Sequence, residues 1–407
     1  MTTHTEAGLE YLERSLLAPA IRPRDLSDLS INCELESQPE TELYRTSSDV
    51  TYHRLGWEQR LSADWRFFDA PASEGWLTVI DFRRVGDRLA YRYLANDDSH
   101  DRLYEPWSSS KIQAFTAAVS ALREQGIGAD ASVGGVKLRD LITSINTYAP
   151  SGDVSGDSNA IATYLLSAAG RDYATALFHK NWLKLANADV RLRGAYGPTT
   201  FAPPSNEFVA SDGTIRVTRS VYNPANNDPG YRTYRCDECG TDGNKAMTAL
   251  AQTEWLKRLA SHARDSSVRH PGLEISDVET LFFGGQQQRE GEVGGMLSGI
   301  SVFLPQALAR AVTPGAGDNA KDTLDAVTNG RWRIYQKVGW GPSETRGTSE
   351  VVMLAHVCLP RVGKTGREFT LLARATVPGD DADESKVGEA GLKLERLLDR
   401  ALPQLLR

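Results

Sequence analysis

The 407-residue sequence has no long hydrophobic run. Its longest apolar stretches, such as residues 351–359, are interrupted, here by His356, and none approaches the ~18 residues of a membrane-spanning helix. The first six residues show neither a basic start nor an apolar core, so no signal peptide is visible. We therefore expect no transmembrane segment. The expected location is periplasmic or secreted if a leader was removed, and cytoplasmic otherwise.

Positive charge is not in excess either. The chain has 46 Lys and Arg against 53 Asp and Glu, a formal net charge of −7, so a basic nucleic-acid footprint is not expected. A composition of 40% hydrophobic and 24% charged residues excludes a disordered or collagen-like chain. At roughly 150 residues per domain, the length suggests two or three domains or one large domain.

Cysteine is scarce, with four residues. Cys33 and Cys358 stand alone, whereas Cys236 and Cys239 form a C-x-x-C. A zinc site needs about four ligands, and the pair has no second C-x-x-C or nearby histidine. We expect a local disulfide or a pair of free thiols there, and neither a metal nor a cofactor. A disulfide would favour an exported protein.

The pattern of apolar residues predicts strands at both ends of the chain. Residues 76–83 and 88–94 are typical of a β-hairpin around Gly86 and Asp87. Three further strands are expected at residues 331–337, 351–359 and 368–377, before a helix that runs to the C-terminus. Together they suggest one sheet assembled from both chain ends.

The middle of the chain is mainly helical in its periodicity. The expected helices, with one near the N-terminus, cover residues 7–17, 111–122, 136–145, 160–169, 183–185 with their flanks, and 247–263. Between about residues 191 and 244 this periodicity is lost among several prolines and glycines. A strand-like run at residues 214–222 makes this stretch a long insertion with a hairpin.

Ser108 and Lys111 form an S-x-x-K pattern at the start of an amphipathic helix. Residues three apart share one face of a helix, so the Lys111 amine can reach the Ser108 hydroxyl. A serine is a weak nucleophile unless a neighbouring base takes its proton, and a buried lysine with a lowered pKa can do so. The alternative is an ordinary polar helix start with an N-cap serine.

Two further motifs follow. The triplet Asp157, Ser158, Asn159 opens an apolar helix, where its simplest interpretation is an N-cap. Lys337 and Gly339 lie where a strand ends, which puts a cation beside an accessible backbone edge. An ordinary surface strand end is the alternative interpretation.

In this order, the three motifs resemble the active site of the penicillin-recognising serine hydrolases, the superfamily of serine β-lactamases and penicillin-binding D,D-peptidases. The layout is most similar to class A β-lactamases, over about residues 70–190 and 245–407. The resemblance implies an α/β (α+β) fold of the β-lactamase/transpeptidase type. Its antiparallel sheet of about five strands is flanked by helices and packs against a mainly helical subdomain.

The same resemblance implies a domain organisation. Residues 1–65 would be an N-terminal extension, and residues 66–107 with 325–407 would form the sheet subdomain. Residues 108–324 would form the helical subdomain, with the insertion at about 191–244.

It also implies roles for individual residues. Ser108 would form an acyl-enzyme with Lys111 as general base or proton relay, while Asn159 positions the substrate amide. Lys337 would supply positive potential for a carboxylate and shuttle protons. Backbone N–H groups of Ser108 and Trp340 would form an oxyanion hole, and Gly339 would keep the substrate edge uncrowded.

The sequence departs from the family pattern at the triplet and the third motif. Asp157 stands where the family has Ser, so Ser158 or Ser155 is a candidate for the missing hydroxyl. The third motif reads K-V-G, and Arg346 is either a compensating carboxylate ligand or a solvated loop arginine. A literal K-T-G at residues 364–366 is rejected because a hairpin turn belongs there.

The resembled family also has an E-x-x-L-N pattern, whose glutamate activates the deacylating water. This pattern is not found in the sequence. The sequence thus predicts a serine hydrolase or acyltransferase for an amide or ester, such as a β-lactam, a peptidoglycan-type peptide or a related small molecule. The missing glutamate argues against an efficient class A β-lactamase. One alternative is a catalytically weak or inactive binding protein of the same fold. Another is an unrelated α/β protein with chance motifs.

Overall fold

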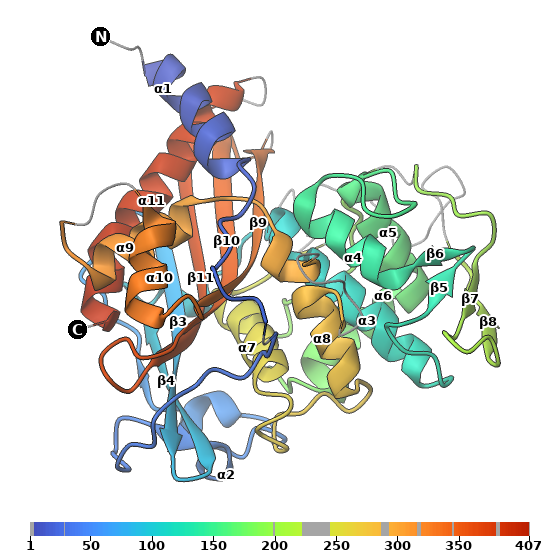
Figure 1. Cartoon of the computed structure of the whole chain (residues 1–407), viewed down its shortest axis with the longest axis horizontal. Coiled ribbons are helices and arrows are strands. Elements are labelled where there is room, and N and C mark those ends of the chain that lie inside the picture. Colours follow the sequence, from blue (N-terminus) through green and yellow to red (C-terminus); the bar gives the residue numbers. More distant parts are fainter. Residues whose placement is uncertain are drawn as a thin grey trace.

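Strands from both ends of the chain pair in one sheet (Figure 1). The computed structural model describes residues 4–27, 29–197, 200–221, 245–285, 293–315, 319–343, 346–379 and 383–406. The long strands are Trp76–Val85 (β3), Arg88–Ala95 (β4), Arg333–Ser343 (β9), Thr348–Leu359 (β10) and Arg367–Pro378 (β11). The order is β1-β4-β3-β11-β10-β9, and the five long strands pair antiparallel with one another. The short strand β2 pairs with β4 in parallel. The prediction of one antiparallel sheet from both chain ends is confirmed.

The sheet has two short strands besides the five long ones. Arg45–Thr46 (β1) and Ala63–Asp64 (β2) both pair with β4, so the described sheet has seven strands where about five were expected. Between β3 and β4, Val85 faces Arg88 across a two-residue turn. Gly86 takes the left-handed φ of 58° that suits such a turn.

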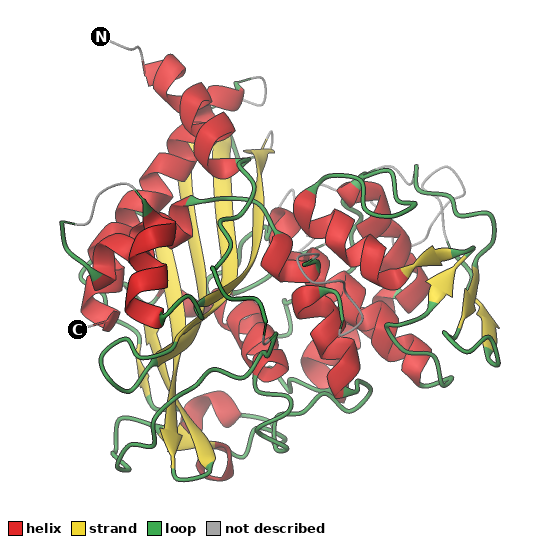
Figure 2. Cartoon of the chain, in the orientation of Figure 1, coloured by secondary structure: helices red, strands yellow, loops and turns green. Residues whose placement is uncertain are grey.

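Helices cover both faces of the sheet (Figure 2). On one face, Glu384–Leu406 (α11) packs against β9, β10 and β11, with Phe303–Val312 (α9) and Ala320–Thr328 (α10) beside it. On the other face lies Ala249–Ala260 (α7). Since β10 is buried on both faces, its sequence is a nearly continuous apolar run.

The helix α7 is buried along its whole length although it carries charged residues. Glu254 accepts hydrogen bonds from Lys257 at 3.1 Å and from Arg258 at 2.6 Å, and Tyr93 of β4 donates to it at 2.7 Å. Paired charges of this kind avoid the desolvation cost of an isolated buried ion. The bond from Tyr93 joins α7 to β4 of the sheet.

The helical lobe lies beyond α7 (Figure 1). It contains Lys111–Arg123 (α3), Leu138–Thr147 (α4), Ser158–Ala169 (α5), Arg171–Ala176 (α6) and Ile275–Phe283 (α8). A small sheet at its far side has the order β6-β5-β7-β8, from Ser132–Val133 (β5), Val136–Lys137 (β6), Glu207–Val209 (β7) and Arg216–Thr218 (β8). The β7–β8 pair confirms the hairpin expected in the insertion, whereas Cys236 and Cys239 lie outside the described residues.

One helix prediction was wrong. Residues 183–185 lie in a loop after α6 and the π-helical turn Leu177–Asn181. Lys184 has a φ of 59°, and the Leu183 carbonyl accepts hydrogen bonds from Trp57 and Arg258. The carbonyl is thus occupied by tertiary partners instead of a helical N–H.

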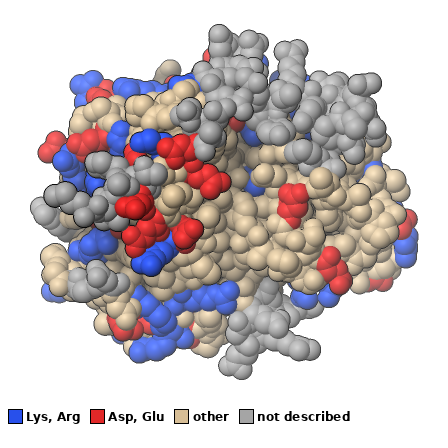
Figure 3. Space-filling model, turned by 90° about the horizontal axis from the view of Figure 1, so that it is seen from above, with Lys and Arg blue, Asp and Glu red and all other residues tan. Residues whose placement is uncertain are grey.

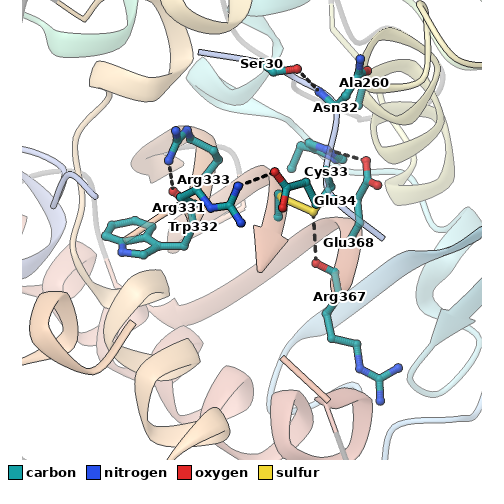
Figure 4. The surroundings of a disulfide bond; sticks show 12 residues. Ser30, Asn32, Cys33, Glu34, Ala260, Arg331, Trp332, Arg333, Arg367 and Glu368 are labelled. Atoms are coloured by element: carbon teal, nitrogen blue, oxygen red, sulfur yellow. Dashed lines mark hydrogen bonds and ion pairs between the residues drawn. A yellow bond between two sulfur atoms is a disulfide. The ribbon is translucent and has the colours of Figure 1, made fainter. Parts of the chain in front are cut away.

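The N-terminal region is joined to the sheet. Cys33 and Cys358, which stand alone in the sequence, form a disulfide across 325 residues with a Cα–Cα distance of 5.4 Å (Figure 4). Tyr52 and Trp57 are fully buried in the same core as the sheet. The N-terminal region and the sheet therefore share one core, and the division at residue 65 stays a prediction.

The N-terminal helix packs on the C-terminal one. His4–Tyr11 (α1) lies along α11 and continues into a π-helical turn, Leu12–Leu16 (η1). Among the described residues, no helix combines the length and apolarity needed to cross a membrane.

Candidate active site

Ser108 lies in a tight turn at the start of α3. Residues Trp107–Ser110 form a 3-10 turn (η4), which Ser109 and Ser110 stabilise by donating to the carbonyls of Pro106 at 2.6 Å and Trp107 at 3.1 Å. Trp107 has a φ of 49°, which is rare for a bulky residue and is typical of functional sites. The turn leaves Ser108 half-buried, where it lines a cavity.

Lys111 joins the first two motifs. Its amine is fully buried and donates to Ser158 Oγ at 2.9 Å and to Asn159 Oδ1 at 2.6 Å. Burial, reinforced by the nearby charge of Lys245, holds the pKa of Lys111 well below its ordinary value, while Asp157 acts in the opposite direction. The packing of α3 on α5 therefore brings a lysine that is readily neutral to the D-S-N triplet.

The third motif meets the first through a residue that the sequence motifs did not reveal. Lys337 Nζ on β9 donates to the hydroxyl of Tyr148 at 2.8 Å, and this hydroxyl donates to the Val338 carbonyl at 3.2 Å. The Ser108 side chain is close enough to act on the pKa of Tyr148, and both residues line the same cavity. Burial, followed by the charge of Lys111, lowers the pKa of Lys337 well below its usual range. Tyr148 thus connects the serine to the lysine of the K-V-G motif.

Tyr148 follows the last residue of α4 and has a left-handed φ of 56°. Lys337 and Lys111 lie 4.0 and 5.0 Å from its ring centroid, and Trp340 packs on it at 5.0 Å. Burial raises the pKa of Tyr148, so the phenol is neutral near pH 7. The sequence held no local signal for this role, since a tyrosine after a helix is common.

The third motif approaches the serine turn closely because Gly339 has no side chain. A Cβ there would lie 2.6 Å from Ser108 N and 2.7 Å from Ser109 N. At Gly341, a Cβ would lie 2.4 Å from the Trp107 ring. The strand β9 can therefore line the serine only with glycine at both positions.

Two residues considered for substrate binding have protein partners. Asp157 caps α5 by accepting from Ala160 N at 3.0 Å, which is the simpler interpretation of the triplet. Arg346 pairs with Glu350 at 3.0 Å and Glu105 at 2.8 Å. Neither Asp157 nor Arg346 lines the cavity.

The Arg346 cluster supports the serine turn instead. Glu350, which Arg346 contacts, also accepts a hydrogen bond from Trp107 Nε1 at 2.8 Å. This network fixes the ring that packs on Gly341. The contribution of Arg346 seen here is to hold Trp107 in place.

A cavity of about 460 Å³ opens beside Ser108. The predicted residues Ser108, Asn159 and Trp340 line it, together with Tyr148, Tyr196 and Lys245, which sequence reasoning missed. Leu12 and Leu17 of the N-terminal region form part of the wall. The only carboxylate among the described lining residues is Glu384, exposed at the start of α11.

The site therefore brings a serine, two buried lysines and a tyrosine together beside a cavity. Within the described ranges, no group of three or more His, Cys, Asp and Glu residues is placed to hold a metal ion. The chemistry that these residues can perform is nucleophilic attack by the serine with proton transfer by lysine and tyrosine.

Comparison with known proteins gives matches at the level of structure. No protein-family model matches the sequence, and no curated protein is similar to it at a significant level. The structure is similar to that of TLA-3 extended-spectrum β-lactamase, at 9% identity and a TM-score of 0.44, over 83% of this chain and 95% of that one.

Two other similar structures are a β-lactamase from Streptosporangium roseum and a class A β-lactamase from Mycobacterium abscessus. Both are 13% identical with a TM-score of 0.36; they cover 81% and 80% of this chain, and 95% and 91% of their own. At these values the matches carry no argument about activity. The antiparallel sheet with helices on both faces and the adjoining helical lobe confirm the α/β (α+β) architecture that the sequence predicted.

Proposed function

We propose that this protein is a serine hydrolase or acyltransferase that forms an acyl-enzyme at Ser108. The observation that carries the proposal is the meeting of three motifs from distant parts of the chain at one serine. Lys111 contacts the triplet, Tyr148 contacts Lys337, and Tyr148 and Ser108 line one cavity. The proposed substrate is an amide or ester, such as a β-lactam, a peptidoglycan-type peptide or a related molecule.

In the first step, Ser108 Oγ attacks the substrate carbonyl and its proton passes to Lys111. This transfer needs a neutral amine, which burial of Lys111 favours. The hydrogen bonds from Lys111 to Ser158 and Asn159 position the amine. Ser158 therefore supplies the hydroxyl beside Lys111, and Ser155 is exposed.

The negative charge that develops on the carbonyl oxygen needs donors. We assign this role to the backbone N–H groups of Ser108 and Trp340, because Gly339 lets β9 approach the Ser108 turn. Preorganised donors of this kind contribute ~3 kcal/mol each to transition-state stabilisation.

In the second half of acylation, the C–N or C–O bond breaks and the leaving group takes a proton from Tyr148. Lys337 then reprotonates Tyr148 through the hydrogen bond seen at 2.8 Å. A lysine with a lowered pKa gives up its proton more readily than an ordinary one, which suits Lys337 to this task.

Hydrolysis of the acyl-enzyme is proposed to be slow. The described cavity lining offers Glu384 as its one carboxylate, on the α11 side and outside the serine turn. A second candidate function, a catalytically weak or inactive binding protein of this fold, is favoured by the same observation. The two functions differ in whether Ser108 becomes acylated.

The experiment is covalent labelling followed by intact-mass measurement. We expect a fluorophosphonate or a fluorescent penicillin to add one adduct, and peptide mapping to place it on Ser108. Ser108→Ala should abolish the adduct, whereas Ser155→Ala, at an exposed position, should retain it. Equal labelling of Ser108→Ala, or no adduct with either probe, would reject the Ser108 assignment.

The disulfide between Cys33 and Cys358 supports a periplasmic or secreted location, since such bonds persist in oxidising compartments.

A further inference from the structure

Lys245 is a third lysine at the cavity that the proposed acylation does not use. It is 3% exposed and lines the same cavity as Ser108. Its Nζ donates to the Ala195 carbonyl at 2.8 Å and lies 4.5 Å from the Tyr196 ring centroid. The ammonium is therefore held in place from one side by a neutral carbonyl and an aromatic face.

The wall that carries Lys245 is the wall that carries Asn159. Tyr196 N donates to Thr163 Oγ1 of α5 at 3.0 Å, and Thr163 in turn donates to the Gly197 carbonyl at 3.2 Å. A Cβ on Gly197 would lie 3.1 Å from the Asn159 Cβ. Residues 195–197 thus run along the start of α5 beside Asn159.

Tyr148, to which Lys337 of β9 donates, also lines the cavity. The lining around Ser108 thus includes Tyr148 as well as Asn159 and Lys245. The leaving group points toward Tyr148, which protonates it in the proposed mechanism. The acyl portion consequently points toward Asn159 and Lys245.

The charge of Lys245 is not balanced by an ion pair with any described residue. Glu105, the acid that most affects it, is itself paired with Arg346 at 2.8 Å. A lysine has three N–H donors, and the Ala195 carbonyl occupies one of them. A carboxylate in the cavity can accept the others.

On the face seen from above, Lys and Arg side chains are interspersed with Asp and Glu (Figure 3). At the far rim of the cavity, Glu384 stands beside the apolar Leu12 and Val387. An anionic group is thus attracted to the Lys245 wall and repelled from the α11 rim.

We propose that Lys245 binds a second, anionic group on the acyl side of the substrate, so that the enzyme prefers amides or esters of dicarboxylic acids. This inference rests on the proposed function for the direction of the acyl group. Lys245 is a specificity-determining residue in this proposal. Its charge also helps to lower the pKa of Lys111, an effect that both esters in the test share.

The test compares two esters that differ in one charged group. The mono-p-nitrophenyl ester of glutaric acid carries an acyl-side carboxylate, and p-nitrophenyl pentanoate has a methyl group in its place. We expect wild-type kcat/KM to favour the glutarate ester. Lys245→Met should lower the ratio of the two kcat/KM values about tenfold or more, since a hydrogen-bonded charge is lost, and Lys245→Arg should retain most of it.

A matched control removes a positive charge elsewhere. Lys137→Met, at an exposed position in the helical lobe, should leave the ratio unchanged. Lys245→Gln replaces the methionine variant if circular dichroism shows that the latter does not fold. An unchanged ratio in the folded Lys245 variant would overturn the proposal. An equal loss of kcat/KM with both esters would also overturn the proposal, because it indicates that Lys245 has a structural role.

A binding measurement separates this inference from the proposed function. Calorimetric titration of Ser108→Ala with glutarate needs no acylation, and adding Lys245→Met should weaken binding about tenfold. If the wild type hydrolyses neither ester but glutarate binds through Lys245, the proposed function fails and the anion site stands. If glutarate binding does not depend on Lys245, or is absent, the anion site is rejected.

Discussion

Tyr148 is the residue at which the separate parts of the site meet. Its hydroxyl accepts from Lys337 and donates to the Val338 carbonyl, and its ring lies under both Lys337 and Lys111. It also lines the cavity together with Ser108. Asp157, at the position where the resembled family has serine, caps a helix instead. In the proposed mechanism, Ser158 and Tyr148 supply hydroxyl groups near Lys111 and Ser108 instead.

Removing only the Tyr148 hydroxyl should slow acylation. Tyr148→Phe keeps the ring between the lysines but interrupts proton delivery to the leaving group, and we expect about a hundredfold lower acylation rate. Time-resolved intact-mass measurement with a penicillin gives that rate. Tyr173→Phe, whose hydroxyl contacts Ser120 in the helical lobe, serves as control and should acylate normally. Wild-type kinetics in Tyr148→Phe would contradict the proposed relay.

The acylation rate should also depend on pH through Lys111. The base is active when neutral, so the rate falls as the pH falls through the pKa of Lys111. Because burial lowers that pKa well below its ordinary value, acylation should persist at neutral pH, where an ordinary lysine is protonated. A pH profile of the acylation rate checks this.

A charged substitution provides the control for this pH dependence. Lys111→Arg keeps the charge, but a guanidinium does not lose its proton, so acylation should fall at least about a hundredfold at every pH. A profile that rises only above about pH 10, the range of an ordinary lysine, or an active arginine variant, would exclude Lys111 as the base.

At the scale of elements, β9 places a lysine, a backbone edge and a ring beside the serine turn. Lys337 and Gly339 face the site, whereas Val338 packs in the core beneath α11. The threonine that K-T-G would have at residue 338 is therefore replaced by a residue that lies in a hydrophobic cluster. The K-V-G departure follows from this packing.

Adding one methyl group to β9 should separate it from the serine turn. Gly339→Ala would bring a Cβ within 2.7 Å of two backbone nitrogens, which must shift. A displacement of ~1 Å costs about a hundredfold in rate, and overpacking costs ~1–3 kcal/mol of unfolding free energy. Acylation kinetics and urea unfolding measure the two effects.

The matched control is Gly347→Ala, in an open left-handed turn between β9 and β10. This variant should lose stability through backbone strain while acylating at the wild-type rate. Unchanged acylation in Gly339→Ala would show that the close approach of β9 is not required.

Changing K-V-G to the K-T-G of the resembled family should not raise the acylation rate. Val338→Thr would place a hydroxyl in the core under α11, and we expect a loss of ~1–2 kcal/mol in unfolding free energy. Acylation by a penicillin should stay close to the wild-type rate. A marked gain in acylation would mean that residue 338 does reach the substrate.

At the scale of the whole molecule, the N-terminal region is tied to the sheet and to the cavity. The disulfide joins Cys33 to β10, Tyr52 and Trp57 fill the core, and Leu12 lines the cavity wall. The first 65 residues thus contribute to stability and to the shape of the site.

Breaking the disulfide should destabilise the protein. The bond closes a very long loop, and its removal by Cys33→Ser with Cys358→Ser should lower the unfolding free energy by ~2–5 kcal/mol. Urea unfolding of the double variant measures the loss. A matched double variant at Cys236 and Cys239 tests whether the effect is specific, and free Cys33 in thiol labelling of the unreduced protein would contradict the pairing.

The elements and the order of the motifs follow from local sequence. The alternation at β3 and β4, the apolar run of β10 and the helical period of α3 are visible within a few residues, so each could be predicted. Ser108 and Lys111 were predicted in the same way, from their spacing of three residues at the start of a helix.

Which distant residues lie beside Ser108 and Lys111 depends on how the helices and strands pack against one another. Tyr148 and Lys337 are 189 residues apart, and Cys33 and Cys358 are 325 apart. Lys245 faces the cavity because residues 195–197 lie along α5. Periodicity reports which side of an element is buried, but contacts between elements depend on how those buried faces pack, and no local pattern contains that information.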